Sequence, residues 1–374
     1  MSSPKERVLV ALSGGVDSSV TAALLKEAGH EVFSATLKTF CYAGRGGGAK
    51  ACCGLEGIDA ARAAAASLGI PHTIFDVSKE FERDVIDDFT IEYAAGRTPN
   101  PCVRCNATVK IPWLLEKART LGCTAIATGH YARVEPVPEG GMGLFRGADT
   151  AKDQAYFLWE IPAHVLPHLR FPLGGMTKPQ VRELARRFGL SNAEKPESQE
   201  ICFVPDGDYV AFLRERLPVG HPGFQPGPIV DTAGNRLGTH DGYLGFTIGQ
   251  RKGLGGGHGR RLFVVAIDPA TRTVIAGESS DVEGRILRID RVNSLLGSPL
   301  IAGMAVSVQI RHRAKALPAH IVDVSDAGSV LLELTEMARS ITPGQSGVLF
   351  AGNRLIAGGR IARINQALGG KTLS

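Results

Sequence analysis

The stretch VLVALSGGVDSS, residues 8–19, decides the fold of the first half of this chain. Val8–Leu12 is a short apolar run typical of a buried strand, and it leads directly into Ser-Gly-Gly. A helical segment, Ser19–Ala28, follows and ends at Gly29. A turn of this kind directs backbone N–H groups and a helix N-terminus at one small volume, which suits a bound phosphate.

Downstream of this turn, strand patterns and helical patterns alternate. The strand patterns lie at Glu31–Leu37, His72–Val77 and Thr124–Thr128, and the helical patterns lie at residues 57–68, 80–95 and 109–121. This alternation predicts an α/β fold with a doubly wound parallel sheet. In such sheets ligands bind at the carboxyl ends of the strands, where we expect Ser13–Gly15, Leu37 and Gly129–His130.

The composition changes near Leu217, where proline and glycine become dense and short strand patterns follow. Such patterns are typical of small β domains and barrels. We therefore predict a catalytic α/β domain over residues 1–210, a small β-rich domain over 211–283 and a C-terminal β-barrel over 284–374. Helices are expected to continue through residues 150–205, notably at Lys178–Phe188.

Composition sets the broad class of protein. The 374 residues carry a formal net charge of +5, an excess that permits a polyanionic partner but does not require one. No run approaches the ~18 apolar residues of a membrane span, and the N-terminus does not resemble a signal or transit peptide. We expect a cytoplasmic protein that does not engage a membrane. The odd count of 7 cysteines favours reduced, reactive or metal-binding thiols over a disulfide framework.

The residue types in the loop indicate how a phosphate would bind. The glycines let the backbone approach a pyrophosphate, and Asp17, which bare phosphate would repel, is expected to hold Mg²⁺. The loop lacks the Gly-Lys-Ser/Thr of a Walker A motif. It resembles the PP-loop of the N-type ATP pyrophosphatases, which cleave ATP between the α and β phosphates and adenylate an oxygen. The plainer alternative is a tight strand–helix turn with a helix cap.

The cysteines narrow the range of reactions that the protein is expected to catalyse. Cys102 and Cys105 lie in the stretch NPCVRCN, residues 100–106, between two helical patterns, and Cys202 lies far downstream. Replacing a pyrimidine C=O by C=S needs an activated oxygen, a persulfide sulfur and a second thiol that releases it. The alternatives are half of a zinc site or a redox pair. Cys123 reads as a small core residue, and no role is assigned to Cys41, Cys52 or Cys53.

Over nearly its whole length the sequence resembles one family, the bacterial tRNA-specific 2-thiouridylases. Several short segments in the same order carry this resemblance. They are residues 11–18, 96–101, 105–106, 127–131, 152–158, 201–203, 249–255 and 342–345.

The resemblance implies a function and a set of site residues. The substrate is the wobble uridine of tRNA, flipped out of its stack, and the sulfur comes from a persulfide-carrying donor protein. Cys105 is the nucleophile, Cys202 carries the persulfide, and the two form a disulfide during turnover. The C-terminal barrel binds tRNA, and the enzyme is expected to be a monomer. ATP contacts fall on Ala11, Leu12, Ser13, Gly14, Gly15, Val16, Asp17, Ser18, Leu37 and Gly129. Contacts with tRNA fall on Asn100, Pro101, Cys102, His130, Lys152, Asp153, Gln154, Arg311, His312 and Gln345.

One departure from the family pattern opens a second mechanism. Family members usually carry Asp where this chain has Cys102. With Cys105 and Cys202, this extra thiol could ligate three irons of a [4Fe–4S] cluster and leave the fourth iron open to sulfide. We favour the persulfide route and keep the cluster as an alternative. Another departure is Leu37, where Met is common; a backbone contact with adenine would survive it.

Basic residues in the C-terminal part give weaker support for RNA binding. They are Arg285, Arg288, Arg291, Arg311, Arg313 and Lys315, in a predicted β region with few acids. Two other functions stay open at this point. One is an amidating synthetase with the same phosphate loop, which would not need Cys105 and Cys202. The other is an RNA-binding protein with a degenerate nucleotide fold, against which the intact loop argues.

Overall fold

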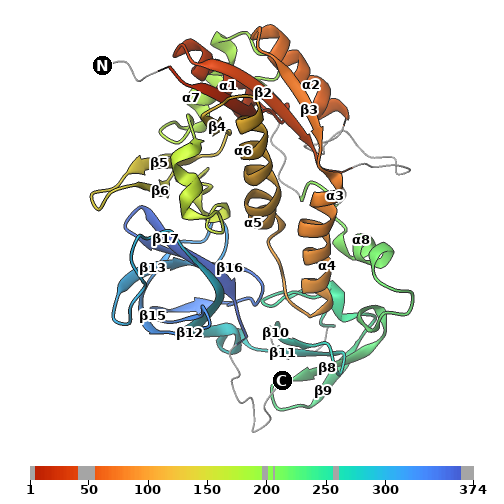
Figure 1. Ribbon diagram of the computed structural model, residues 1–374. Helices are drawn as coiled ribbons and strands as arrows, with labels where there is room; N and C mark the ends of the chain where they lie inside the picture. The colour runs from red at the N-terminus through yellow and green to blue at the C-terminus, as the bar shows by residue number, and fades with distance from the viewer. Residues whose placement is uncertain (1–4, 41–54, 196–200, 205–206, 256–260, 364–374) are drawn as a thin grey trace.

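The computed structural model describes residues 5–40, 55–195, 201–204, 207–255 and 261–363. Its first sheet has five parallel strands in the order β3-β2-β1-β4-β7 (Figure 1). These strands are β1 (Arg7–Ala11), β2 (Glu31–Lys38), β3 (His72–Asp76), β4 (Ala125–Ala127) and β7 (Leu169–Arg170). The predicted parallel α/β sheet is therefore confirmed.

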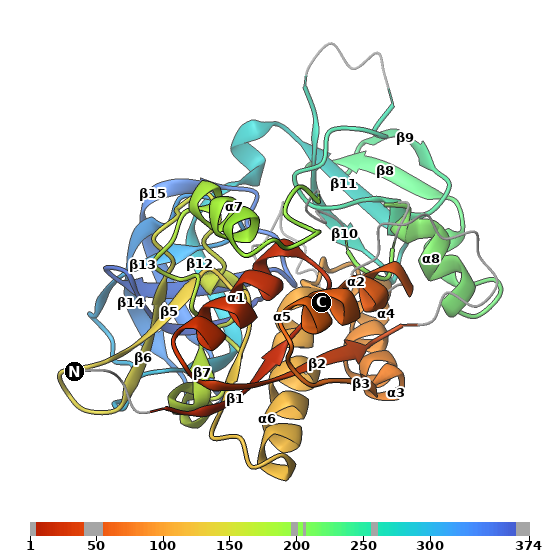
Figure 2. The same ribbon diagram turned by 90° about the horizontal axis from the view of Figure 1, so that it is seen from above.

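Helices cover both faces of this sheet because its strands bury side chains on both sides. Along β1, Val8 and Val10 pack with helices α1 (Val16–Glu27) and α2 (Leu55–Ser67). Leu9 points to the opposite face and packs with α6 (Ile111–Thr120). Figure 2 shows α1 and α2 on one side of the sheet and α6 on the other. A run of consecutive apolar residues is what a strand buried on both faces requires.

The cysteine segment forms a helix rather than the expected link between helices. Three helical elements follow one another without a break: α5 (Pro101–Arg104), the π-helix η2 (Cys105–Lys110) and α6. Asn100 starts this run, because its Oδ1 accepts the Cys102 N–H at 3.2 Å and Pro101 occupies the first turn. The preceding run joins α3 (Ser78–Phe81), π-helix η1 (Glu82–Ile86) and α4 (Asp87–Ala94).

The expectation of helices through residues 150–205 was largely wrong. Residues 155–157 and 163–168 form 3₁₀ turns, η3 (Ala155–Phe157) and η4 (Ala163–His168), and β7 follows. The predicted helix is present as α7 (Lys178–Arg187), which a capping box at Thr177 starts. A further helix, α8 (Tyr209–Arg216), follows Cys202.

Two β units follow the parallel sheet. The first has strand order β10-β11-β8-β9, with β8 (Gly227–Asp231), β9 (Arg236–His240), β10 (Phe263–Asp268) and β11 (Thr273–Gly277). The second is a closed barrel of six strands, β12-β15-β14-β13-β16-β17, which the β12–β17 pairing closes. Its strands are β12 (Glu283–Ser294), β13 (Ala305–Gln309), β14 (Leu317–Val324), β15 (Val330–Arg339), β16 (Ser346–Ala351) and β17 (Arg354–Ile361). The predicted C-terminal barrel is confirmed, and the exact domain boundaries stay a prediction.

A hairpin that the sequence did not indicate joins the parallel-sheet unit to the barrel. Strands β5 (Ala132–Pro136) and β6 (Met142–Arg146) follow β4, and β6 pairs with β17 at Leu144↔Leu355. In Figure 1 the barrel and the β8–β11 sheet lie below the parallel sheet on different sides, and α4 and α5 run down toward them. None of the helices in the described part of the chain is long and apolar enough to cross a membrane.

Candidate active site

The phosphate loop is held by its own side chains. Ser18 Oγ accepts the Ser13 N–H at 3.1 Å and donates to the Gly15 carbonyl at 3.0 Å. Gly14 has a φ of +74°, and a Cβ there would collide with the Gly57 carbonyl oxygen in the first turn of α2. Only glycine meets both conditions. The loop between β1 and α1 is therefore a fixed turn packed against a second helix.

The predicted ATP contacts come together at the carboxyl edge of the sheet. Gly129 follows β4, and a Cβ on it would lie 2.9 Å from the Ser18 backbone nitrogen. The Leu12 N–H donates to the Ala35 carbonyl of β2 at 2.8 Å, and Leu37 lies two residues farther along that strand. Three neighbouring strands thus end around one helix N-terminus, which is the arrangement that favours a bound anion.

Asp17 makes contacts that the sequence did not predict. Lys178 Nζ lies 2.7 Å from both carboxylate oxygens, and the Tyr131 hydroxyl donates to Oδ1 at 2.8 Å. Lys178 is buried, with 8% of its side chain exposed. Among the described residues, no three Asp, Glu, His or Cys side chains are grouped so as to hold a metal ion. The residues here do not fit a resident Mg²⁺ site, although Mg²⁺ that arrives on ATP phosphates needs few protein ligands.

His130 is neutral over the physiological pH range. Burial and the nearby Lys110 charge lower its pKa to about 3, and one ring nitrogen lies 2.6 Å from Thr128 Oγ1. Its ring packs edge-to-face on Phe171, with ring centroids 5.7 Å apart. Since His130 follows Gly129 directly, an uncharged imidazole lies beside the phosphate loop.

The two cysteines with predicted catalytic roles pack against the same apolar cluster. Cys105 and Cys202 are half-buried, and both contact the buried group that includes Phe81, Phe89 and Phe203. Leu37, at the nucleotide end of β2, packs against that cluster too. Cys105 also begins the π-helix η2, and π-helical turns are frequent at functional sites.

The third cysteine is placed differently. Cys102 is exposed, whereas Cys123 is buried at the start of β4, as expected of a core residue. In the described residues Cys102, Cys105 and Cys202 do not form a three-ligand group, so the structure does not fit the predicted [4Fe–4S] alternative. Cys41, Cys52 and Cys53 lie outside the described residues.

Several residues predicted to contact tRNA lie where the barrel meets the cysteine segment. Gln345 Nε2 donates to the Thr98 carbonyl at 3.0 Å and so holds the chain just before Asn100. Asn100 caps α5 through its Oδ1, which accepts the Cys102 N–H. Through these contacts Gln345 and Asn100 stabilise the fold, in addition to the RNA contacts predicted for them.

Arg311 and His312 lie on the barrel side of the same region. Arg311 Nη2 donates to the Ser340 carbonyl at 2.9 Å and to Thr342 Oγ1 at 2.8 Å, and burial lowers the pKa of its guanidinium. The His312 ring lies 4.4 Å from the Phe157 ring, between centroids. Burial and the charge of Arg313 lower the pKa of His312.

The predicted tRNA contacts Lys152, Asp153 and Gln154 form a separate turn. Asp153 accepts the Gly147 N–H at 3.0 Å and a hydrogen bond from Arg146 at 2.7 Å, so its carboxylate serves the fold. Gln154 Oε1 accepts the backbone N–H of Tyr131 at 3.0 Å. Tyr131 contacts Asp17, and Arg146 also donates to Gln309 Oε1 of β13 at 2.9 Å, so this turn is tied both to the phosphate loop and to the barrel.

The basic residues of the C-terminal part do not form one group. Arg285, Arg288 and Arg291 lie on β12, whereas Arg313 and Lys315 follow β13. In the closed barrel β12 and β13 are three strands apart in either direction. Barrel closure therefore separates these residues, which the sequence placed together in one β region, onto two sides of the barrel.

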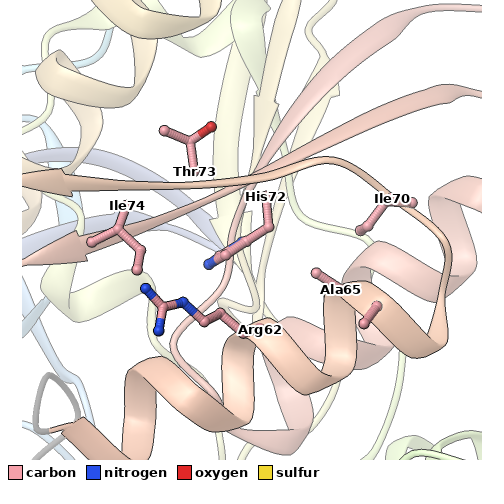
Figure 3. A pocket seen from close by; sticks show the side chains of 7 residues that line it. Arg62, Ala65, Ile70, His72, Thr73 and Ile74 are labelled. Atoms are coloured by element: carbon pink, nitrogen blue, oxygen red, sulfur yellow. The ribbon is translucent and has the colours of Figure 1, made fainter.

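A groove lies at the edge of the parallel sheet. It measures about 450 Å³ and lies between α2 and the edge strand β3, where Arg62 and His72 face each other (Figure 3). Ser34 Oγ and Thr36 Oγ1 lie 2.9 Å and 3.4 Å from the two ring nitrogens of His72. Strand β2 lies between β3 and β1, which leads into the phosphate loop, and none of the predicted site residues lines the groove, so we do not assign it to the site.

Sequence reasoning missed the residues that reach the site from far away. Lys178 and Tyr131 are 161 and 114 residues from Asp17, and Asn192, which donates to the Gly14 carbonyl at 3.1 Å, is 178 residues away from that glycine. No spacing links these residues to the loop. Only the position of α7 beside α1 could have indicated them.

A parallel sheet with this loop at its carboxyl edge, followed by a barrel, defines a PP-loop enzyme that uses ATP. Family models match residues 6–206 as a tRNA methyl transferase HUP domain, 211–278 as a tRNA methyl transferase PRC-barrel domain and 284–361 as an aminomethyltransferase beta-barrel domain.

Full-length relatives identify the family. The tRNA-specific 2-thiouridylase MnmA of Heliobacterium modesticaldum is 46% identical over 96% of this chain and 93% of its own length. The protein of the same name from Geobacter metallireducens is 46% identical over 96% of this chain and 97% of its own. This chain belongs to the tRNA-specific 2-thiouridylase family. A solved 4-thiouridine synthetase–RNA complex with bound ATP covers 57% of this chain and 50% of that chain at 16% identity, and its TM-score of 0.33 is too low to carry an argument.

Proposed function

We propose that this enzyme uses ATP to replace the C2 oxygen of the wobble uridine of tRNA with sulfur. The observation that carries the proposal is the shared position of Leu37, Cys105 and Cys202 against one buried cluster. Two half-buried thiols that pack against the same cluster as a predicted ATP contact are what thiolation requires and what an amidating synthetase does not need. The name of the curated relatives supports the choice of tRNA and of the 2-position.

The first half-reaction is adenylation. The uracil C2 oxygen attacks the α-phosphorus of ATP, the bond to the β-phosphate oxygen breaks, and pyrophosphate leaves. The loop around Ser13–Ser18 would hold the leaving pyrophosphate with backbone N–H groups. Mg²⁺ would arrive with the nucleotide as part of the substrate. AMP bound to O2 is then a far better leaving group than oxide.

The second half-reaction transfers sulfur. A donor protein leaves a persulfide on Cys202, and its terminal sulfur attacks C2 while AMP departs. The Cys105 thiolate then attacks the Cys202 sulfur, which breaks the S–S bond and leaves sulfur on the base. A Cys105–Cys202 disulfide results, and a cellular dithiol reduces it. Exposed Cys102 has no part in this scheme.

The proposal is tested with purified variants, unmodified tRNA, ATP and a persulfide donor. Cys202→Ser and Cys105→Ser should form no 2-thiouridine, while tRNA-dependent release of pyrophosphate still occurs, because the phosphate loop is intact. Cys102→Ser is the matched control and should keep most of its activity. Nucleoside mass spectrometry and chromatography of labelled ATP supply the readouts. ADP as the nucleotide product, or an active Cys105→Ser enzyme, would refute the scheme.

A further inference from the structure

The chain just before the cysteine helix is held from the side of the β8–β11 sheet. The Tyr243 hydroxyl donates to the Ala94 carbonyl at 2.8 Å. Gly96 has a φ of +65°, and a Cβ there would lie 3.0 Å from Pro269 and 3.2 Å from Ile267. This close approach leaves residues 94–96 little freedom to move relative to the central unit.

The barrel holds the next residues of the same segment. The Thr98 N–H donates to the Pro343 carbonyl at 2.9 Å, and Gln345 Nε2 donates to the Thr98 carbonyl at 3.0 Å. Gly344 approaches so closely that a Cβ on it would lie 2.8 Å from the Thr98 nitrogen. Two backbone groups of Thr98 are therefore fixed by a barrel turn about 245 residues farther along the chain.

A buried set of charged side chains joins the barrel to α4 and to the segment before the cysteine helix. Arg360, on barrel strand β17, donates through Nη2 to both oxygens of Asp88 at 2.7 and 2.8 Å, and its Nη1 lies 3.2 Å from Glu92. Glu92 in turn accepts two hydrogen bonds of 2.7 Å from Arg97. Burial alone would raise the pKa of Glu92, but these arginines hold that pKa below its ordinary value. The side chains of Arg360 and Glu92 are only 12% and 6% exposed.

The same charges reach the residue next to the predicted nucleophile. Arg104 Nε lies 4.0 Å from Asp88, and its Nη1 is bonded to Glu160. Arg104 ends α5, and Cys105 follows it. A continuous path of charged contacts thus leads from β17 through α4 to the cysteine helix.

Buried ion pairs of this kind seldom add much stability, because removing charges from water offsets their attraction. Their geometry is more informative. Arg360 donates from Nη2 to both oxygens of Asp88, and its Nη1 lies at ion-pair distance from Glu92 one turn farther along α4 without a hydrogen bond, so the guanidinium ties two turns of α4 to the barrel. Lysine, with a single ammonium, could keep the charge but could not meet the two carboxylates through separate nitrogens.

We propose that Arg360 is a positioning residue for sulfur transfer: the barrel, through Arg360, Asp88 and Glu92, fixes the helix that carries Cys105. The role of Cys105 itself rests on the proposed function. In this proposal Arg360 acts through its contacts with α4, whose Asp88 lies 4.0 Å from Arg104. Without it, the cysteine helix should move against the phosphate loop while the loop, with its local hydrogen bonds, keeps its shape.

The test uses the full chain and its own cysteines as probes. Arg360→Met, Arg360→Lys and the control Arg354→Met are pulse-labelled with iodoacetamide, and peptide mass spectrometry gives the alkylation rate at each cysteine. Arg354 is the matched control because it lies on the same strand and pairs with Glu139 of the hairpin rather than with α4. Exposed Cys102 reports intrinsic reactivity, and buried Cys123 reports global loosening.

Loss of positioning predicts a local change. In Arg360→Met, alkylation of Cys105 should rise ~5-fold or more while Cys123 stays protected, since opening is confined to one segment. The rate of 2-thiouridine formation should fall ~10- to 100-fold at saturating tRNA, with KM for ATP within ~2-fold, because a misplacement of about 1 Å suffices for such a loss. Arg360→Lys should recover part of the protection of Cys105 and part of the rate of 2-thiouridine formation. Arg354→Met should change neither quantity.

Other outcomes overturn the inference. Equal rises at Cys105 and Cys123 would mean that Arg360 serves only global stability, and unchanged alkylation in both Arg360 variants would mean that it positions nothing. If the Met variant does not fold, the Lys variant decides the matter by the same readouts. If the unsubstituted enzyme forms no 2-thiouridine, the proposed function fails, but alkylation still judges the positioning of Cys105.

Discussion

In the proposed mechanism the phosphate loop and the cysteine helix serve one reaction, but they are held in different ways. In the loop, Ser18 bonds to Ser13 and Gly15, three to five residues away. Before the cysteine helix, Thr98 and Glu92 are held by Gln345 and Arg360, about 250 residues away. The loop is closed by its own residues and held by others of the same α/β unit, such as Lys178 and Asn192, whereas the cysteine segment is held from separate units.

Because the two sites are held differently, ATP binding and sulfur transfer depend on different contacts. A loop held by residues of its own α/β unit can bind a nucleotide whatever the neighbouring domains do. A thiol whose helix is fixed by a barrel is in position only when the barrel is docked. The division suits an enzyme that must not transfer sulfur before its large substrate is in place, since adenylation and sulfur transfer can then depend on different contacts.

The largest effect is expected from a change that breaks the local site. Gly14→Ala should lower tRNA-dependent release of AMP ~100-fold or more, because a Cβ would collide with the Gly57 carbonyl and the φ of +74° disfavours alanine. Gly175→Ala is the control, since a Cβ there meets nothing within 4 Å. Labelled ATP gives the rates. An active Gly14→Ala enzyme would show that the loop is less closely packed than described.

A smaller effect tests how local the loop really is. Lys178→Met leaves the partly buried Asp17 carboxylate with the Tyr131 hydroxyl but no cation, which should lower the free energy of unfolding by about 2 kcal/mol. Urea unfolding measures the change. Arg187→Met is the control, because its pair with Glu27 is exposed on both sides and should contribute less than about 0.5 kcal/mol. Equal losses of unfolding free energy in Lys178→Met and Arg187→Met would contradict the difference expected between a partly buried and an exposed ion pair.

The smallest effect concerns pH. The folded pKa of His130 is about 3 against an ordinary value of 6.5, so between these values only the unfolded chain takes up the proton. The stability linked to His130 is therefore complete above pH 6.5 and is lost as the pH falls toward 3. Between pH 7 and 5, His130→Gln should lose about 1–2 kcal/mol less than the unsubstituted protein, measured by urea unfolding at each pH. Equal losses of stability in the two proteins would mean that His130 also takes up a proton in the folded protein over this pH range.

Sequence reasoning succeeded where the pattern is local. Consecutive apolar residues in Val8–Leu12 predicted a doubly buried strand, and the motif through Ser18 predicted the turn after it. It failed for the hairpin at residues 132–146, which is a strand pair only because β17 offers it an edge. It also failed to see that Cys102 and Cys105 lie on a helix, although Asn-Pro is a good helix start.

The sequence by itself determined the parallel sheet, the phosphate loop, the C-terminal barrel and the family, because each depends on short-range periodicity or on contiguous motifs. Tertiary structure alone decided that Asp17 meets Lys178, that Gln345 and Arg360 hold the cysteine segment, and that the basic residues of the barrel fall into two groups. The physical reason is that these contacts follow from how helices pack and how a barrel closes. Both bring together residues whose distance along the chain carries no signal.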